Sequence, residues 1–381
     1  MTKKDVKVEL GKFDIYIIGA GISGSVLANK YATLQNKKVL IIDTRDHIGG
    51  NCFDYVNGDG VLVSKYGAHL FHTNYEDVWE YLQNFSTWYK YEHKVKSMVD
   101  GQLVPIPVNI ETVNLIFKLN IKNEGEMKLW FDKNIKKIES PVNSEESALN
   151  RVGPVLYEKM FKNYTIKQWD IEPKDLEAAV MDRIPVRSNF DDRYFNDSLQ
   201  YLPTDGYTPI FNKMLENENI TVLTNTKWED IQAFINPDYE KIFFTGKIDS
   251  FFEDKLGKLE YRSLKFEFET FDKEYFQKYG VINYPESNIP YTRIVEYKHF
   301  TKQKLSKTTI SKEYSTWEGD PYYPVPTQKN RDLFDKYKKL ANDLEKNNIY
   351  FVGRLANYKY FNMDQAFKNA LDLYSELSKK L

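Results

Sequence analysis

Three glycines near the N-terminus have the spacing that proteins use to bind a nucleotide diphosphate. Gly19, Gly21 and Gly24 form a G-x-G-x-x-G pattern within the stretch IYIIGAGISGSV. In such a pattern one glycine permits a tight turn, one lets the backbone approach a pyrophosphate, and one lets a helix pack closely on a strand. The pyrophosphate lies at the N-terminus of that helix, where free N–H groups and the helix dipole favour negative charge. The pattern therefore predicts a dinucleotide site.

The elements expected around the glycines support this prediction. FDIYIIG is a short apolar run typical of a buried parallel strand, SGSVLANKYATL predicts a helix, and KKVLIID predicts a second strand. Asp43 ends the second strand, about where an acidic residue accepts a hydrogen bond from the ribose. Strand, glycines, helix, strand and acid in this order favour a nucleotide site over an isolated glycine turn.

The residues after Asp43 favour FAD over NAD as the dinucleotide. TRDHIGGN supplies Arg45, the pair Gly49 and Gly50, and then Asn51. An NAD-binding half has no need of a second glycine pair, whereas FAD proteins of the glutathione-reductase type commonly carry one, and this stretch resembles theirs.

A second element near the C-terminus also favours FAD. NIYFVGRLANYKYFNMDQAF predicts a strand that ends at Gly353 and a helix that begins at about Met363, with Asn362 and Gln365 at capping-box spacing. A helix N-terminus aimed at the isoalloxazine would favour negative charge on a reduced flavin.

KYGAHLFHT places His69 and His72 at His-x-x-His spacing. Three interpretations are open for the pair: metal ligation, a structural role, and a hydrogen bond beside the flavin. No cysteine or cluster of carboxylates completes a metal site, so no metal is predicted.

Arginines interleaved with tyrosines follow in the middle of the chain. A guanidinium grips phosphate with two parallel hydrogen bonds, and tyrosine hydroxyls can donate to the remaining oxygens. Each arginine could equally pair with a surface acid, but together they indicate a pyrophosphate-bearing substrate beside the flavin. The residues of these clusters are Tyr164, Trp169, Arg183, Arg187, Asn283, Arg293, Tyr322, Tyr323 and Arg354.

The order of these motifs resembles the UDP-galactopyranose mutase family over nearly the whole chain. The resemblance is carried by GAGISG, IGGNC, KYGAHLFHT, YTIKQW, RIPVR, DDRYF, PYTRIVEYKHF, PYYPVPT and GRLANYKYFNMDQA. It implies an isomerase that interconverts UDP-galactopyranose and UDP-galactofuranose through a covalent adduct between the sugar and N5 of reduced FAD, with no net redox change. It also implies an external reductant, either NAD(P)H or a flavin-reducing system, and a homodimer.

The resemblance further implies roles for individual residues. The implied catalytic residues are Arg183, Arg293, His69 and Arg354. The implied FAD-binding residues are Gly19, Gly21, Ile22, Ser23, Gly24, Asp43, Arg45, Gly50, Asn51, His69, Gly353, Arg354, Met363 and Asp364. The implied substrate-binding residues are Met160, Tyr164, Thr165, Trp169, Arg183, Tyr194, Asn283, Arg293, Tyr322, Tyr323 and Tyr360, with either Tyr322 or Tyr323 on the diphosphate.

Met160 departs from the family pattern. It lies one helical turn before Tyr164, where bacterial relatives usually have an aromatic residue that sandwiches the uracil. A thioether can still pack against a ring, so the departure bears on affinity for uridine and on selectivity for the base.

Composition limits the classes of protein that fit. A chain of 381 residues predicts two or three domains, and a net charge of −2 argues against nucleic-acid binding. The single cysteine, Cys52, allows no disulfide framework. With no signal-peptide pattern and no apolar run of membrane-spanning length, a cytoplasmic enzyme is expected.

The pattern along the chain predicts an α/β fold with three parts. Residues 11–89, 204–245 and 326–381 are expected to form a discontinuous Rossmann-like FAD-binding domain. A helical insertion domain is expected at 107–180, where Val152, Leu156, Met160 and Tyr164 form one apolar stripe. An antiparallel β-sheet substrate domain is expected from 90–106, 181–203 and 246–325.

Two other classes of protein share parts of this pattern. A flavin oxidoreductase of the amine-oxidase or desaturase type would need an apolar substrate channel, which the arginines and tyrosines disfavour. A flavoprotein or UDP-sugar-binding module without activity would have no need of Arg183, Arg293, Tyr360 and His69 together.

Overall fold

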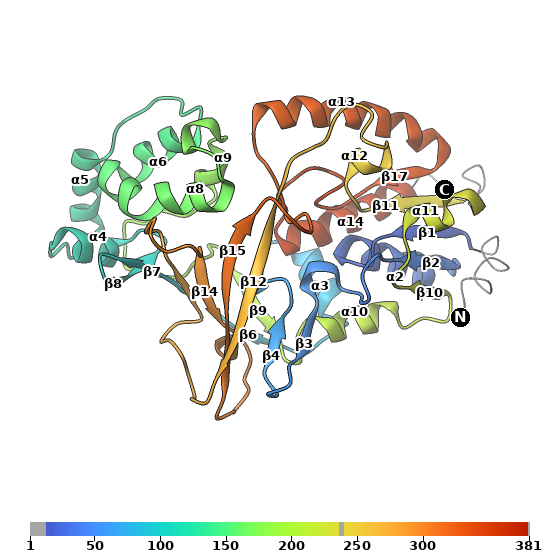
Figure 1. The fold of residues 1–381 in the computed structure, drawn as a ribbon, viewed down its shortest axis with the longest axis horizontal. Coiled ribbons are helices and arrows are strands. Elements are labelled where there is room, and N and C mark those ends of the chain that lie inside the picture. The colour runs from blue at the N-terminus through green and yellow to red at the C-terminus, as the bar shows by residue number, and fades with distance from the viewer. Residues whose placement is uncertain (1–12, 236–239, 380–381) are drawn as a thin grey trace.

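The computed structural model describes residues 13–235 and 240–379. Residues 11–12, 236–239 and 380–381 of the predicted domain ranges lie outside the described residues. Figure 1 shows a parallel sheet with helices on both faces, a long twisted sheet beside it, and a group of helices at the far end of that long sheet.

A five-stranded parallel sheet carries the glycine-rich turn. Its strand order is β10-β2-β1-β11-β17, and every neighbouring pair is parallel. Two strands from the range 204–245, β10 and β11, pair with β2 and β1 in this sheet. The bounds are β1 Ile15–Ile18, β2 Val39–Ile42, β10 Ile220–Leu223, β11 Lys241–Phe244 and β17 Ile349–Phe351.

Both faces of this sheet are buried, which explains why its strands are apolar without alternation. Ile15 and Ile17 pack into a cluster with helices on one face, whereas Tyr16 and Ile18 pack into a separate cluster on the other. The first face is covered by α2 (Ile22–Gln35), α10 (Thr208–Leu215) and α14 (Met363–Ser378). The second is covered by α11 (Trp228–Ile231), α12 (Ile248–Phe251) and the end of α13 (Gln328–Leu344).

The long sheet has the strand order β16-β12-β15-β14-β13-β7-β8. Its neighbours are antiparallel except for β13 and β7, which are parallel. The bounds are β7 Val95–Val99, β8 Gln102–Ile106, β12 Tyr261–Phe271, β13 Val281–Asn283, β14 Arg293–Glu296, β15 Thr308–Thr316 and β16 Tyr323–Pro324.

A helical group packs on one end of the long sheet, where Val95, Ile106 and Val281 share a core with Met127 and Leu156. Its α-helices are α4 Ile110–Phe117, α5 Glu124–Asn134, α6 Ser144–Val152, α7 Pro154–Leu156, α8 Asn163–Trp169 and α9 Ala179–Asp182.

The apolar stripe predicted from Val152 to Tyr164 is wrong in its first member. Helix α6 ends at Val152, and Gly153 has φ +82°. This left-handed conformation, which suits glycine, redirects the chain. The following helix then contains a π-helical turn, Tyr157–Lys162, between α7 and α8.

Smaller elements complete the described residues. The hairpin is β3 Asp54–Val56 with β4 Leu62–Ser64, and the three-stranded sheet is β5 Phe71–Thr73, β9 Leu199–Pro203 and β6 Trp88–Lys90. Helix α3 is Glu76–Gln83, and short 3₁₀ turns are Gly50–Cys52, Pro173–Asp175, Gln232–Phe234, Tyr297–Phe300 and Glu345–Asn347. Among the described residues, every helix is too short or too polar to cross a bilayer.

Candidate active site

The glycine-rich turn lies at the carboxyl end of the parallel sheet. It follows β1, and the strands on the two sides of β1 are β2 and β11, so the chain builds the sheet outward from β1 in two directions. Crevices at such switch points bind ligands in open α/β sheets. Gly19 follows β1 with φ +109°, and a Cβ there would lie 2.0 Å from Thr245 Oγ1. A Cβ on Gly50 would lie 2.9 Å from the Cα of Gly21. The two glycine motifs thus form one backbone cradle, and the residues present fit a dinucleotide phosphate.

Asp43 is oriented at this edge by the backbone. Its carboxylate oxygens accept the N–H of Ala20 at 2.8 Å and the N–H of Arg45 at 2.9 Å. The side chain of Arg45 donates to Asn51 Oδ1 at 3.0 Å, and its guanidinium lies 4.2 Å from the centre of the Tyr66 ring. Each carboxylate oxygen keeps a second lone pair for a ligand hydroxyl.

The two ends of the chain meet at this edge. Gly353 follows β17, and a Cβ on it would lie 2.8 Å from Ser23 Oγ at the start of α2. Helix α14 begins at Met363, as predicted, and the N–H of Asn362 donates to Gln365 Oε1 at 3.0 Å. Asp364, in the first turn of α14, is 5% exposed.

A cavity of about 270 Å³ adjoins this edge, between the parallel sheet, the helical group and the long sheet. It brings together all eleven residues predicted to bind substrate, all four predicted catalytic residues, and Asn51 and Met363 from the predicted cofactor set. The other predicted cofactor residues do not line this cavity: Gly19, Gly21, Ile22, Ser23, Gly24, Asp43, Arg45, Gly50, Gly353 and Asp364.

Guanidinium groups and stacked tyrosines form one wall of the cavity. The Tyr323 and Tyr360 rings are stacked, with centres 4.9 Å apart and planes at 16°. The Arg183 guanidinium lies 4.0 Å from the Tyr360 ring centre and that of Arg354 lies 5.3 Å from it. Although burial opposes ionisation, Arg183, Arg354 and Arg293 lower the pKa of Tyr360. The wall is therefore strongly electropositive.

Arg293 is held from behind by a buried carboxylate. Its Nε donates to Glu313 Oε2 at 2.5 Å, and the side chains are 32% and 1% exposed respectively. Burial opposes the charge on Arg293, but Glu313 reverses this and raises the pKa of Arg293 well above its usual value. This contact occupies Nε and fixes the plane of the guanidinium.

His69 and His72 have different surroundings. His69 lines the cavity, and its Nδ1 lies 2.8 Å from the carbonyl oxygen of Gly67. Because a carbonyl only accepts, Nδ1 carries the proton and Nε2 keeps its lone pair. Burial lowers the pKa of His69 to about 4, and Arg354 and Arg293 add to this effect.

His72 pairs instead with Asp197 at 2.8 Å and stacks on Phe195. The described part of the chain holds no group of three histidine, cysteine, aspartate or glutamate residues that could ligate a metal ion.

Asn283 supplies a recognition group, its amide oxygen, that has no hydrogen-bond partner among the described residues. It is 8% exposed, lines the cavity, and its Oδ1 is buried with no hydrogen bond. A buried unpaired amide costs free energy unless a ligand satisfies it. The geometry therefore fits a ligand with hydrogen-bonding edges, such as a nucleobase.

The π-helical turn Tyr157–Lys162 changes which side chains line the cavity wall formed by the helical group. Met160 and Phe161 are consecutive in sequence, yet both are buried and both line the cavity with Tyr164. A π turn adds a residue to the helix and often marks a functional site. Phe161 thus places an aromatic side chain on the same cavity wall as Met160. Regular α-helical spacing predicts that two consecutive residues point in different directions.

Two further residues of the site escaped the sequence analysis. Glu313 was not predicted from the sequence. It is a charged residue on β15, where Ile310 and Ser311 are also fully buried. Tyr66, against Arg45, was also missed, and only its place beside the His69 motif could have indicated it.

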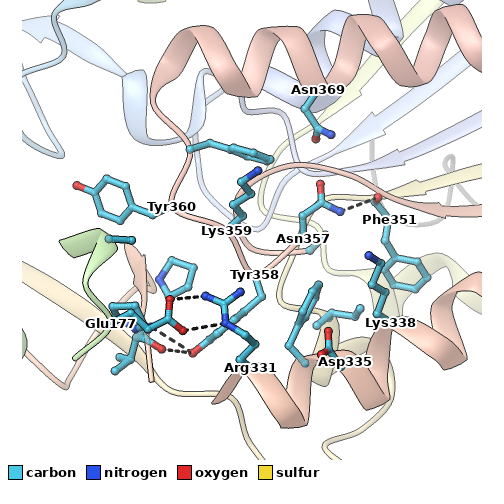
Figure 2. A pocket seen from close by; sticks show the side chains of 18 of the residues that line it. Glu177, Arg331, Asp335, Lys338, Phe351, Asn357, Tyr358, Lys359, Tyr360 and Asn369 are labelled. Carbon is cyan, nitrogen blue, oxygen red and sulfur yellow. Dashed lines mark hydrogen bonds and ion pairs between the residues drawn. The ribbon is translucent and has the colours of Figure 1, made fainter. Parts of the chain in front are cut away.

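A larger cavity of about 790 Å³ shares Trp169, Arg183 and Tyr360 with the first. Figure 2 shows side chains that line it, among them Arg331 of α13, which forms an ion pair with Glu177 from the helical group. The chemically reactive groups converge in the smaller cavity.

The fold and the site together define a class: a Rossmann-like α/β protein whose dinucleotide edge opens onto an anion-binding pocket. The model of the NAD(P)-binding Rossmann-like domain matches residues 17–85, and that of UDP-galactopyranose mutase matches residues 159–360. The chain belongs to the UDP-galactopyranose mutase family, which is a family of isomerases. Family membership and the Rossmann-like match indicate a flavin cofactor.

Three similar proteins illustrate this relationship. A dTDP-fucopyranose mutase from Escherichia coli is 39% identical over 366 residues, which are 94% of this chain and 96% of the relative. A probable UDP-galactopyranose mutase from Klebsiella pneumoniae is 39% identical over 372 residues, covering 95% and 94%. A crystal structure of reduced UDP-galactopyranose mutase has a TM-score of 0.75 at 17% identity, covering 97% of this chain and 96% of that one.

Proposed function

We propose that the protein interconverts UDP-galactopyranose and UDP-galactofuranose, using FAD in its reduced form. The observation that carries the proposal is the convergence of Arg183, Arg293 and Arg354 on the stacked pair Tyr323 and Tyr360. Several guanidinium groups in one partly dehydrated pocket suit a diphosphate, because each can donate two parallel hydrogen bonds to its oxygens.

The residues have separate tasks in this proposal. Arg183 and Arg293 stabilise the negative charge that develops on the diphosphate as it leaves the sugar, and they keep it near for recombination. Tyr360, Tyr323 and Tyr194 donate to the remaining phosphate oxygens. Tyr323 is favoured over Tyr322 because it stacks on Tyr360, whereas Tyr322 packs toward Tyr66 and Phe266.

The nucleoside is bound at the other end of the cavity. Asn283 hydrogen-bonds the base through its unpaired amide, while Tyr164, Met160 and Phe161 pack on the ring. Thr165 and Trp169 complete the pocket and its rim.

The cofactor is held by the cradle of Gly19, Gly21 and Gly50 and by the start of α14. Reduced FAD bound there would supply a nucleophile, N5, that would displace the diphosphate from the anomeric carbon with no net transfer of electrons. His69 presents its unprotonated Nε2 to the cavity as a hydrogen-bond acceptor, and Arg354 lies beside it. An external reductant, NAD(P)H or a flavin-reducing system, keeps the flavin reduced, and the protein acts as a homodimer.

A direct assay tests this function. The purified protein is examined for flavin absorbance, reduced with dithionite, and given UDP-galactofuranose, and the products are separated by chromatography. Conversion to UDP-galactopyranose by the reduced protein, and little by the oxidised protein, is expected. Replacing the cofactor with 5-deaza-FAD should abolish conversion, and undiminished turnover with the analogue would contradict the role of N5.

A second candidate is suggested by the relative named dTDP-fucopyranose mutase, which is as similar to this chain as the Klebsiella protein. Met160 in the base pocket supports it, since a flexible thioether adapts to a ring that carries an extra methyl group. Parallel assays with UDP-galactofuranose and a dTDP-linked 6-deoxysugar distinguish the two by their kcat/KM values.

A further inference from the structure

Lys167 lies on the second turn of α8, outside the cavity lining, and is bound like a cation in a cage of carbonyl oxygens. Its Nζ donates to the carbonyl oxygen of Tyr284 and to those of Glu286, Ile289 and Tyr291 at 3.0, 3.0 and 3.1 Å. A lysine ammonium has three N–H donors and no acceptor, so its whole hydrogen-bonding capacity is used on this one loop.

The loop in question connects β13 to β14, the two strands that present Asn283 and Arg293 to the cavity. Asn283 and Arg293 are cross-strand partners, and the Tyr284 N–H donates to the Thr292 carbonyl at 2.9 Å just beyond them. The four carbonyls come from both ends and the middle of the loop. One ammonium therefore fixes the shape of the whole connection.

The helix that carries Lys167 forms the facing wall of the cavity. Tyr164 and Trp169 of α8 line the cavity. The last turn of α8 is fastened to the long sheet, because the carbonyl of Gln168 accepts from Arg262 Nε at 3.1 Å and from Ser315 Oγ at 2.5 Å. Lys167 adds the connection from α8 to the β13–β14 hairpin.

We propose that Lys167 is a positioning residue that sets the separation between the two walls of the nucleotide pocket, α8 with Tyr164 and the hairpin with Asn283. This inference rests on the proposed function, because it takes the ligand of that pocket to be a nucleoside diphosphate. The ammonium contacts neither wall's recognition groups directly and acts through the backbone of the loop.

Charge is central to this arrangement. Burial lowers the pKa of Lys167 to about 8, and the nearby Glu286 opposes the shift. The side chain is therefore mostly protonated at neutral pH. Hydrogen bonds from a charged donor are roughly twice as strong as those between neutral groups, so a neutral side chain of the same length should release the loop.

The test compares Lys167→Met with Lys162→Met in the flavin-loaded protein, with UDP as the probe. Lys162 is one turn earlier, and pairs with Glu158 at 2.8 Å on the surface. Lys167→Met should weaken UDP binding roughly 10- to 100-fold, which corresponds to about 1.4–2.8 kcal/mol. It should raise KM while kcat at saturation stays within about threefold of wild type. Lys162→Met should leave both unchanged, and Lys167→Arg should restore part of the affinity.

Hydrogen exchange provides a readout that a general structural role would not move. Exchange should accelerate in peptides covering residues 284–291 of Lys167→Met while α5 and the parallel sheet stay protected as in wild type. Equal UDP affinity in Lys167→Met and wild type would overturn the proposal. An unfolded Lys167→Met protein would also overturn the proposal, because Lys167 would then stabilise the fold as a whole and not the loop alone. If wild type itself does not bind UDP, the proposed function fails instead.

Discussion

Asn283 and Arg293 face each other across adjacent antiparallel strands, β13 and β14. The residue with an unpaired amide and the residue with a carboxylate-anchored guanidinium therefore lie side by side at one end of a hairpin. This spacing lets one ligand contact both, with its base at Asn283 and its phosphates at Arg293.

Arg293→Ala is expected to lower kcat/KM by a factor that corresponds to about 2–4 kcal/mol of lost transition-state stabilisation. The reason is that the negative charge on the leaving diphosphate loses a hydrogen-bond donor. The change also leaves Glu313 buried without its partner, which destabilises the fold. Arg293→Lys separates the effects, since it keeps a charge near Glu313 but loses the planar fork. Steady-state kinetics measure the loss of turnover in each variant, and flavin absorbance shows whether each variant still folds and binds its cofactor. Wild-type turnover in Arg293→Lys would contradict the role of the planar guanidinium.

Arg183→Ala is expected to lower kcat/KM by a similar amount, about 2–4 kcal/mol, with flavin still bound. Arg331→Ala is the matched control, because Arg331 lies in the adjoining cavity but pairs with Glu177 on the surface. Exposed pairs contribute about 0–1 kcal/mol, so Arg331→Ala should keep near-wild-type kinetics. Equal losses in the two variants would assign Arg183 a merely structural role.

His69 should remain neutral throughout pH 5.5–8, because burial lowers its pKa to about 4 and an unperturbed histidine titrates near 6.5. Its imidazole NMR signals should therefore not shift until the pH falls toward about 4. The His69→Gln variant assigns the signals among the five histidines. A titration midpoint between pH 6 and 7 would show that the ring is solvated.

Met160→Phe should strengthen UDP binding by about 0.5–1.5 kcal/mol through ring stacking. Because Met160 is only 1% exposed, thermal unfolding serves as the check on overpacking. Comparison of UDP and dTDP affinities tests base selectivity, and the wild-type thioether should discriminate less between them than phenylalanine does. Greater discrimination by the wild type would contradict this.

The segment from Arg183 to Tyr194 is expected to close over the bound diphosphate as a lid. Phe190 at its centre is 54% exposed, so chymotrypsin should cleave there and UDP should slow the cleavage. Tyr275, 45% exposed in the loop after β12, gives an internal control whose cleavage UDP should not affect. Cleavage after Phe190 at the same rate with and without UDP would argue against a lid.

Local patterns predicted those parts of the fold that depend on nearby residues. The glycine turn, the strand that ends at Asp43 and the helix that begins at Met363 all follow from short-range spacing and capping. The predicted stripe was wrong at Val152 because Gly153 ends the helix there. An apolar period predicts neither this break nor the π turn that follows it.

The sequence by itself determined the residue types available for chemistry: glycines for a phosphate and arginines for a diphosphate. Only the tertiary structure decided which of them meet. Glu313 reaches Arg293, and Lys167 binds the loop between β13 and β14, because segments that are separate in the sequence pack together. Such contacts depend on the burial of both partners at once, which one-dimensional spacing does not encode.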